Sequence, residues 1–303
     1  MPRSSRADRP DADAREIVET VATWFAREGR SLPWRAKGAG AWGILVSEVM
    51  LQQTPVSRVL PAWTSWMEWW PTPAALAAAS PGDVIRAWGR LGYPRRAQRL
   101  RECAVAIERD FGGVVPDTVD ALRTLPGVGE YTAAAVAAFA YRRRTVVLDT
   151  NVRRVLARVA GGVADAPSHL TVAERSRADR FVPEDPELAA AWNVGAMELG
   201  ALVCTSRAPR CDECPVSTWC RWLAADCPPA PAPRRVSQTW EGSDRQVRGR
   251  IMALLRASDR ATNVAGHATL ADVDPGQLDR CLEGLVDDGL VRVDSDERGT
   301  YAL

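Results

Sequence analysis

Residues 122–136 read LRTLPGVGEYTAAAV, a pattern that predicts two helices joined by a tight hairpin. Gly127 and Gly129 fall between the two apolar stretches, where glycine allows backbone conformations and close approaches that a Cβ would block. The amides at the start of the second helix then remain available to an anion. On both sides of this segment, from residue 14 to about residue 225, apolar residues recur at helical spacing. The fold class is therefore predicted to be mainly α.

Arginine side chains gather around this hairpin. Arg123 lies within its first helix, and Arg142, Arg143 and Arg144 follow its second helix. Backbone amides and guanidinium groups together predict a contact with phosphate, as in binding to a DNA backbone whatever its base sequence. The charge distribution agrees, because the chain has 31 basic and 26 acidic residues up to residue 240, against 8 and 12 after it. A nucleic-acid surface is therefore expected in the first part.

The composition excludes several kinds of site. Of the 39 basic residues only Lys37 is a lysine, so any mechanism that needs an active-site lysine must use it. With His169 and His267 as the 2 histidines, metal sites built from several histidines are also excluded. The longest strongly apolar run, residues 133–141, is shorter than a membrane span, and no signal peptide opens the chain. We expect a cytoplasmic protein, associated with the nucleoid, that has no membrane partner.

Cysteines are grouped in one short segment. The group consists of Cys204, Cys211, Cys214 and Cys220, which are separated by six, two and five residues. Cytoplasmic thiols stay reduced, so these are better interpreted as metal ligands than as disulfides. Four thiolates suit either a tetrahedral zinc site or an iron-sulfur cube, although structural zinc usually has two close Cys-x-x-Cys pairs and only one is present. Arg207 and Arg210 lie on the loop between the first two cysteines, and we expect them to contact phosphate.

The chain divides by composition into four segments. Residues 1–13 are polar and predicted to be a disordered tail, and residues 14–225 are predicted to form the helical domain. Residues 226–240 are rich in proline and predicted to be a linker. Residues 241–303 hold two helical patterns followed by two strand-like runs, as in a small winged-helix-like α+β module. Because its second helix is acidic, packing or contact with a partner is favoured over DNA reading.

Three motifs occur in an order that resembles the helix-hairpin-helix DNA glycosylase superfamily whose members carry a 4Fe-4S cluster. They are the hairpin, the segment VLDTNVRRVLAR at 147–158 and the cysteine group. Similarity to the MutY family of adenine glycosylases comes from SEVMLQQT at 47–54, LPWR at 32–35 and GRLGY at 89–93. The resemblance spans about residues 17–222. It implies a fold of two helical lobes, one with the hairpin and one with a 4Fe-4S cluster, acting as a monomer on duplex DNA that contains a mispaired adenine.

Removal of adenine by hydrolysis needs a neutral acid for the leaving base and a separate charged carboxylate for the sugar cation. Glu48 lies among apolar residues of a predicted helix, where desolvation raises the pKa of its carboxyl. By resemblance, Glu48 would protonate adenine, and Asp149 would stabilise the cation with help from the Asn151 amide. Tyr131 stands where related bifunctional enzymes carry a catalytic lysine, and a phenol cannot form a Schiff base. The resemblance therefore implies a monofunctional hydrolase without efficient strand cleavage.

Flipping a base out of a duplex leaves a gap that protein side chains must fill. Gln52, Gln53 and Thr54 directly follow the helix that would carry the acid and, by resemblance, would enter that gap. Leu91 and Tyr93 would contact the opposite base. Two plainer interpretations remain open, because the glutamines can be a solvated helix end and Tyr93 can belong to the core.

After the cysteines the sequence departs from the resemblance. MutY proteins commonly carry there a second domain that reads 8-oxoguanine, whereas this chain has a shorter, winged-helix-like segment. Excision of adenine opposite 8-oxoguanine or guanine is therefore better supported than recognition of the oxidised base. Two alternatives stay open, a mismatch-specific thymine or uracil DNA glycosylase and a non-catalytic iron-sulfur protein that binds DNA. Glu48 and LQQT at 51–54 argue against the first, because a pyrimidine lacks the ring nitrogen that an acid must protonate. The second should have lost one carboxyl, whereas both Glu48 and Asp149 are present.

Overall fold

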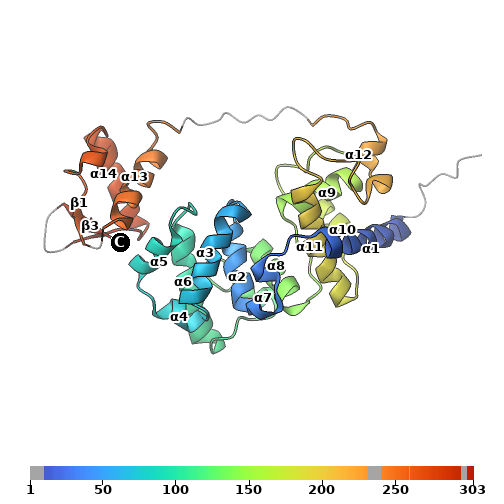
Figure 1. Cartoon of the computed structure of the whole chain (residues 1–303), viewed down its shortest axis with the longest axis horizontal. Helices are drawn as coiled ribbons and strands as arrows, with labels where there is room; N and C mark the ends of the chain where they lie inside the picture. Colours follow the sequence, from blue (N-terminus) through green and yellow to red (C-terminus); the bar gives the residue numbers. More distant parts are fainter. Residues whose placement is uncertain (1–9, 231–239, 259, 295–298) are drawn as a thin grey trace, which may run out of the picture. The chain divides into compact units, whose positions relative to one another are not determined.

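The computed structural model describes residues 10–230, 240–258, 260–294 and 299–303 (Figure 1). Helices dominate these residues, as predicted, and the strands are short. Contacts divide the chain into two units. One unit holds the described parts of Met1–Glu48, Pro116–Thr124 and Val128–Pro233, and the other holds Val49–Val115, Leu125–Gly127 and the described parts of Arg234–Leu303. Each unit has its own hydrophobic core.

The first unit holds more than half of the helices. Its elements are α1 (Pro10–Glu28), η2 (Pro33–Arg35), η3 (Lys37–Ala39), most of α2 (Gly40–Leu51), α7 (Val119–Arg123), α8 (Glu130–Tyr141), α9 (Thr150–Val159), α10 (Val172–Asp179), α11 (Pro186–Leu202), η4 (Ser217–Trp219) and α12 (Arg221–Ala224). The first helix begins at Pro10, before the expected boundary at residue 14, since proline at a first helical position lacks only an amide that would have no partner there. Residues 1–9 of the expected tail lie outside the described residues.

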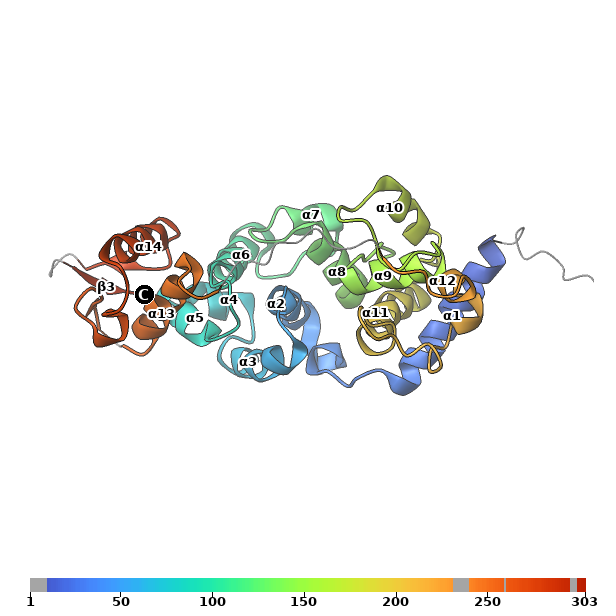
Figure 2. The same cartoon turned by 90° about the horizontal axis from the view of Figure 1, so that it is seen from above.

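The core of the first unit lies where α1, α9 and α11 pack against one another (Figures 1 and 2). Val152, Val155 and Val159 form the apolar face of α9 and are all buried. Trp192 of α11 is also buried and stacks on Phe181, with ring centroids 5.5 Å apart. This core supports both ends of α9, which begins at the predicted catalytic aspartate and runs towards the cysteines.

The second helix of the hairpin, α8, is buried along most of its length. Ala134, Ala135 and Ala138 pack with Val147 and with Met197 of α11. The small alanine side chains let neighbouring backbones pack closely. By contacts, Glu48, α8 and the cysteine segment fall in one unit, while the last residues of α2 and Leu125–Gly127 of the hairpin turn fall in the other.

The second unit begins with the last residues of α2 and contains a group of helices and the C-terminal module. Its further elements are α3 (Val56–Trp69), α4 (Pro73–Ala78), α5 (Pro81–Trp88), α6 (Arg95–Phe111), α13 (Asp244–Arg256), β1 (Thr262–Asn263), η5 (Ala268–Leu270), α14 (Pro275–Asp287), β2 (Arg292–Val293) and β3 (Thr300–Ala302). α4 and α6 lie side by side (Figure 2). Trp66 and Trp88 are fully buried, with ring centroids 5.5 Å apart.

The C-terminal module has the element order expected of a winged helix. Its strands form one antiparallel sheet in the order β1-β3-β2, in which Asn263 pairs with Thr300 and Val293 with Tyr301. α13 and α14 pack against each other beside this sheet (Figure 1). Both helices and the last two strands follow the sequence pattern. β1 was not predicted from the sequence.

Two remaining expectations concern the linker and membranes. Of the predicted linker, residues 226–230 and 240 are described and none of them is in a helix or strand, while residues 231–239 lie outside the described residues. No helix in the described parts of the chain is long and apolar enough to cross a membrane.

Candidate active site

Glu48 is a buried carboxyl near the end of α2. Only 5% of the residue is exposed, and the helix around it is apolar. Burial raises the pKa of Glu48 to about 7, and the nearby charge of Asp149 acts in the same direction. The hydrogen bond from Tyr131 and the charge of Arg35 oppose this rise without cancelling it. A carboxyl in such a setting is available as a neutral acid near pH 7, as its apolar neighbours in the sequence led us to expect.

Tyr131 stands in the first turn of α8, directly after the hairpin. Its hydroxyl donates a hydrogen bond to Oε2 of Glu48 at 3.0 Å. Burial holds the pKa of Tyr131 well above its usual range, and the charges of Glu48 and Asp149 add to this effect. The hydroxyl therefore stays protonated and orients the carboxyl that it touches.

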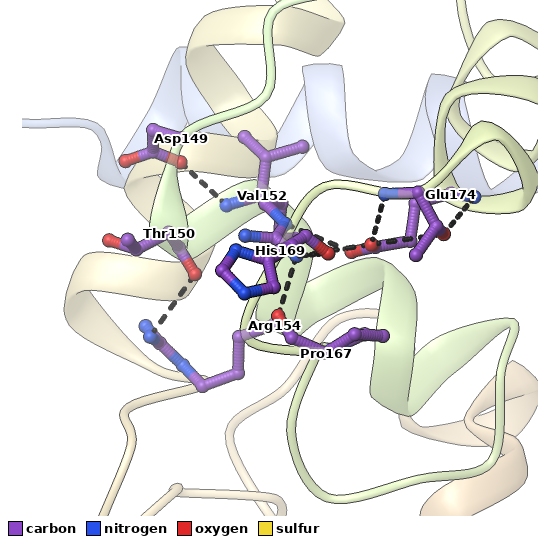
Figure 3. A network of polar contacts seen from close by, with 9 residues as sticks. Asp149, Thr150, Val152, Arg154, Pro167, His169 and Glu174 are labelled. Atoms are coloured by element: carbon purple, nitrogen blue, oxygen red, sulfur yellow. Dashed lines mark hydrogen bonds and ion pairs between the residues drawn. The ribbon is translucent and has the colours of Figure 1, made fainter.

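Asp149 caps the N-terminus of α9. Its Oδ1 accepts a hydrogen bond from the amide of Val152 at 2.7 Å (Figure 3). Its Oδ2 accepts another from the side-chain amide of Asn151, also at 2.7 Å. Burial raises the pKa of Asp149, and the hydrogen bonds from Val152 and Asn151 oppose that rise. The first unit thus brings together an acid with a pKa of about 7, Glu48, and a carboxylate that is hydrogen-bonded at both oxygens.

Arg154 connects this carboxylate to the cysteine segment. Its guanidinium donates to Oδ1 of Asn151 at 2.8 Å and to the carbonyl of Cys204 at 2.8 Å. Since Asn151 itself donates to Asp149, hydrogen bonds run without a break from Asp149 to the first cysteine. Sequence reasoning missed Arg154, although the spacing of Asn151 and Arg154 places their side chains on one helix face.

Arg153, the next residue of the same helix, fixes a different loop. It forms an ion pair with Glu174 at 2.9 Å and donates to the carbonyls of Pro167 and His169 at 2.7 and 3.2 Å (Figure 3). Both side chains of the ion pair are largely buried. The polar side chains of α9 thus have partners within the protein. Asn151 and Arg154 support Asp149 and the cysteine segment, and Arg153 holds the loop before α10.

The four cysteines line one cavity beside α9. Apolar side chains, among them Val155 and Trp222, complete its wall. Burial raises the pKa of Cys211 and Cys220, and it raises the pKa of Cys214 to about 11. Burial thus favours the neutral form of these three thiols, and binding of a metal group favours the thiolate. Four sulfur donors around one largely apolar cavity fit an iron-sulfur cluster.

The spacing of these donors also bears on zinc. Among the described residues, no three of His, Cys, Asp or Glu are grouped as for a single metal ion. Zinc, with each sulfur about 2.3 Å away, would need a tighter group than a four-iron cube does.

The loop between the first two cysteines is held by Arg158. This buried arginine donates to the carbonyls of Thr205 and Ser206 at 2.7 and 3.1 Å. Arg207 is exposed on the loop. Arg210 is exposed too, but it pairs with Glu213 at 2.8 Å. Arg207 is thus the better placed of the two predicted phosphate contacts.

A second buried carboxylate, Glu198 of α11, supports the segment before α2. Arg30 and Arg35 donate to its two oxygens at 2.6 to 2.8 Å. Burial would raise the pKa of Glu198, but the hydrogen bonds from the two arginines outweigh it and lower the pKa to about 2. This ion pair, which sequence reasoning missed, fixes Arg35, whose charge acts on Glu48.

Arg96 of α6 joins the two loops that were predicted to contact DNA bases. One arm, Nη1, donates to the carbonyls of Val49, Met50 and Gln52 at 2.6 to 3.1 Å. The other arm, Nη2, donates to Oγ1 of Thr54 and to the carbonyls of Leu91 and Gly92 at 3.0 to 3.1 Å. The full set of partners is Val49, Met50, Gln52, Thr54, Leu91 and Gly92. This role was not predicted, because an arginine in the run Arg95-Arg96 looks like surface charge.

The predicted base contacts fall into two groups. Thr54 and Leu91 are buried, so their side chains shape the loops from inside. Gln53 and Tyr93 are exposed and have left-handed backbone angles, with φ of 54° and 48°. Residues other than glycine avoid this region, and strained backbone of this kind concentrates at functional sites. Gln53 and Tyr93, with the partly buried Gln52, remain the predicted base contacts.

The hairpin has the predicted form, with α7 and α8 joined by a short turn. Gly127 has a φ of 77°, and a Cβ there would lie 2.8 Å from the Cβ of Arg99, so glycine is required. At Gly129 a Cβ would meet no atom of the described residues within 4 Å. The approach to the first turn of α8 is therefore open, as binding of a phosphate requires.

Comparisons with known proteins agree with this arrangement. The sequence matches the HhH-GPD superfamily base excision DNA repair proteins over residues 46–177 and the iron-sulfur binding domain of endonuclease III over residues 204–220. An adenine DNA glycosylase of Mycobacterium tuberculosis is 50% identical over 290 residues, which are 95% of this chain and 94% of the relative. A thymine-DNA glycosylase of Aeropyrum pernix is 36% identical over 221 residues, which are 72% of this chain and 97% of the relative. The solved structure of a thermostable thymine-DNA glycosylase, 27% identical, matches 72% of this chain and all of its own with a TM-score of 0.66.

These matches confirm the helix-hairpin-helix glycosylase fold and the cofactor. The first family match contains Glu48, the hairpin and Asp149, and the second contains all four cysteines. The cavity that the cysteines line is therefore the site of a 4Fe-4S cluster. The match to the adenine glycosylase covers so much of the chain that it extends into the C-terminal module.

Replacement of one ligand tests the cofactor. We expect Cys214→Ser to lose most of the visible absorption at about 400 nm that an iron-sulfur protein shows, together with iron content and melting temperature. Cys103→Ala is the matched control, since Cys103 is a buried thiol outside the cavity. Equal iron content in both variants and the unchanged protein would contradict the assignment.

Because Arg96 joins two loops, Arg96→Lys should destabilise the protein even though the positive charge is kept. Arg96→Lys leaves buried carbonyls without donors, because an ammonium group cannot reach both loops. We expect the free energy of unfolding to fall by about 3 kcal/mol in chemical denaturation. Arg109→Lys on the exposed face of the same helix should leave it unchanged. A stable Arg96→Lys variant would show that the arginine does not join the loops.

Proposed function

Because this chain belongs to the adenine DNA glycosylase family of base excision DNA repair, we propose that it hydrolyses the N-glycosidic bond of adenine mispaired with 8-oxoguanine or guanine in duplex DNA. The enzyme is monofunctional in this proposal and leaves the DNA strand uncut. We also propose that it works as a monomer in the cytoplasm, at the nucleoid. Glu48, Tyr131 and Asp149 all come from one unit of one chain, so the catalytic group needs no second copy.

The observation that carries this proposal is the difference between two neighbouring carboxyls. Glu48 is buried in apolar surroundings and has a pKa raised to about 7. Burial raises the pKa of Asp149 as well, but its two oxygens accept hydrogen bonds from a helix N-terminus and an amide side chain, and these favour the charged form. Paired carboxyls with such different environments support an acid and a charge stabiliser in one reaction.

In the proposed reaction, Glu48 donates its proton to a ring nitrogen of adenine. The base then leaves as a neutral molecule, and the bonding electrons of the glycosidic bond remain with it. The sugar that is left has oxocarbenium character, and the Asp149 carboxylate stabilises its positive charge. Water completes the hydrolysis. Tyr131 keeps its own proton and holds the Glu48 carboxyl in place throughout.

The protein would bind duplex DNA through the phosphate backbone. Two loops, which carry Gln52–Thr54 and Gly89–Tyr93, would contact the bases. We assign the backbone contacts to the first turn of α8 after Gly127 and Gly129, and to Arg207 on the loop beside the cluster. Cys204, Cys211, Cys214 and Cys220 would hold the 4Fe-4S cluster, and this ligation would fix the ends of the loop that carries Arg207. Gln52 and Gln53 would fill the gap that the flipped adenine leaves, and Tyr93 would contact the opposite base.

The second candidate is a mismatch-specific thymine or uracil glycosylase. The 36% identical thymine-DNA glycosylase of Aeropyrum pernix favours it, as nearly the whole of that relative, 97%, matches this chain. Against it stands the buried acid Glu48, for which a pyrimidine offers no ring nitrogen to protonate. A non-catalytic DNA-binding protein has still less support, since it has no use for an acid with a raised pKa beside a second carboxyl.

Duplexes with one defined mispair distinguish the two enzymes. The protein is incubated with each duplex, and abasic sites are then cleaved with alkali. We expect product from adenine opposite 8-oxoguanine and opposite guanine, and none from thymine or uracil opposite guanine. Product from thymine alone would establish the second candidate instead.

The raised pKa of Glu48 predicts how activity depends on pH. An acid must be protonated to act, so the single-turnover rate of adenine release should be lost as pH rises through about 7, by about tenfold per pH unit. Glu48→Gln should lower the rate by about 10²- to 10⁴-fold. Tyr131→Phe removes a hydrogen bond that lowers the pKa of Glu48, so the fall should move to higher pH. A rate that does not change between pH 6 and 9 would rule out Glu48 as the acid.

The phenol at residue 131 predicts the absence of a covalent lysine intermediate. Incubation with the adenine-containing duplex and sodium borohydride should yield no stoichiometric protein–DNA adduct, because Lys37 is the only lysine of the sequence and residue 131 is a tyrosine. Endonuclease III with its own substrate serves as the positive control. A stoichiometric adduct at Lys37 would show a lyase mechanism.

A further inference from the structure

The C-terminal module is joined to the helices on both sides of the loop Gly89–Tyr93. α5 precedes this loop and α6 follows it. Ile85 of α5 belongs to the same hydrophobic core as the helices of the module. Gln98 of α6 donates a hydrogen bond to the carbonyl of Gly289 in the module. All of these residues lie in the second unit, so the module supports the loop from both flanking helices.

Asp288, directly after α14, receives an arginine from each side. Its side chain is 12% exposed and pairs with Arg95 of α6 and with Arg248 of α13. A largely buried carboxylate between two guanidinium groups fixes α13 in one position on α6. The charge of Asp288 is thus used in packing. From the sequence we favoured packing or contact with a partner over DNA reading for this acidic segment.

Arg245 lies one helical turn before Arg248, on the same face of α13. Its Nη2 donates to the hydroxyl of Tyr93 at 3.2 Å, and its guanidinium lies 5.5 Å from the centre of the Tyr93 ring. The ring of Trp240 is 5.3 Å from the same guanidinium. The module thus places a cation between its own tryptophan and the tyrosine of the loop.

The side chains of this group remain open to solvent. Tyr93 is 49% exposed and Trp240 is 56% exposed, and Arg245 is exposed as well. Tyr93 has a left-handed backbone, which its packing and the hydrogen bonds of Arg96 hold in place. Exposed aromatic rings beside a guanidinium are surfaces on which nucleic-acid bases stack.

We propose that Arg245, presented between Tyr93 and Trp240, hydrogen-bonds the base opposite the adenine and makes the enzyme prefer 8-oxoguanine to guanine there. The inference rests on the proposed function, which assigns Tyr93 to that base. It gives the short C-terminal module a role in reading the oxidised base.

The chemistry of the two bases supports a contact with arginine. Guanine offers O6 and N7 as acceptors, and arginine is their commonest partner. In 8-oxoguanine N7 carries a proton, and a carbonyl oxygen is added at C8. A guanidinium has five N–H donors and no acceptor, and the bond to Tyr93 uses one donor. The others can bind the added oxygen, which guanine lacks, so the contact distinguishes the two bases.

The test compares Arg245→Ala and Arg245→Lys with Arg292→Ala, which removes an exposed arginine of β2 in the same module. Affinities are measured by fluorescence anisotropy in a Glu48→Gln background, so that no adenine is removed. The duplexes hold adenine opposite 8-oxoguanine or opposite guanine. We expect both Arg245 variants to lower the ratio of the two affinities by about tenfold, and Arg292→Ala to leave it unchanged. Because Arg245 is exposed, melting temperatures should stay the same.

Each outcome decides the matter. An equal loss of affinity for both duplexes, with recovery by Arg245→Lys, would show a phosphate contact and overturn the inference. An unchanged ratio in both Arg245 variants would overturn it too. Single-turnover rates with Glu48 present test the proposed function separately. If adenine is not released from either duplex but Arg245→Ala still lowers the affinity ratio, the proposed function fails and the reading role of Arg245 stands.

Discussion

The burial of one carboxyl, that of Glu48, is the constraint on which the catalytic unit depends. A carboxyl removed from water costs free energy unless it is neutral or hydrogen-bonded. Burial raises the pKa of Glu48 to about 7, which favours the neutral form, and Tyr131 donates a hydrogen bond to the carboxyl. That donor stays in place because the alanine-rich α8 is packed against α11. Arg35, which opposes the rise in pKa, is held in turn by the buried Glu198.

Several arginine side chains hold backbone segments in place by donating hydrogen bonds to their carbonyls. Arg96 binds five carbonyls and one hydroxyl, and so holds two loops in left-handed conformations that their residues would otherwise avoid. Arg154 and Arg158 hold the loop between the first two cysteines by donating to the carbonyls of Cys204 and Thr205. A guanidinium can serve several acceptors from one rigid plane, which a lysine cannot. The strong preference for arginine over lysine in this chain therefore has structural uses, in addition to any contact with DNA.

The C-terminal module takes part in the same organisation. Its core includes a residue of α5, and its helix α13 is fixed to α6 through Asp288. The loop between α5 and α6 carries Tyr93, so the module meets this predicted DNA-contact loop through a direct hydrogen bond. A small module can therefore act on base recognition without adding a large domain.

The sequence by itself determined the helical fold, the hairpin, the cysteine group and the chemistry of Glu48, Asp149 and Tyr131. These features depend on local periodicity, on the conformational freedom of glycine and on ligand spacing, all of which can be read along the chain. Only the tertiary structure decided which arginines bind carbonyls, that Thr54 and Leu91 are buried, and that Arg245 reaches Tyr93. Those contacts join residues up to about 150 positions apart, and no local pattern records which distant carbonyl or ring a guanidinium will meet.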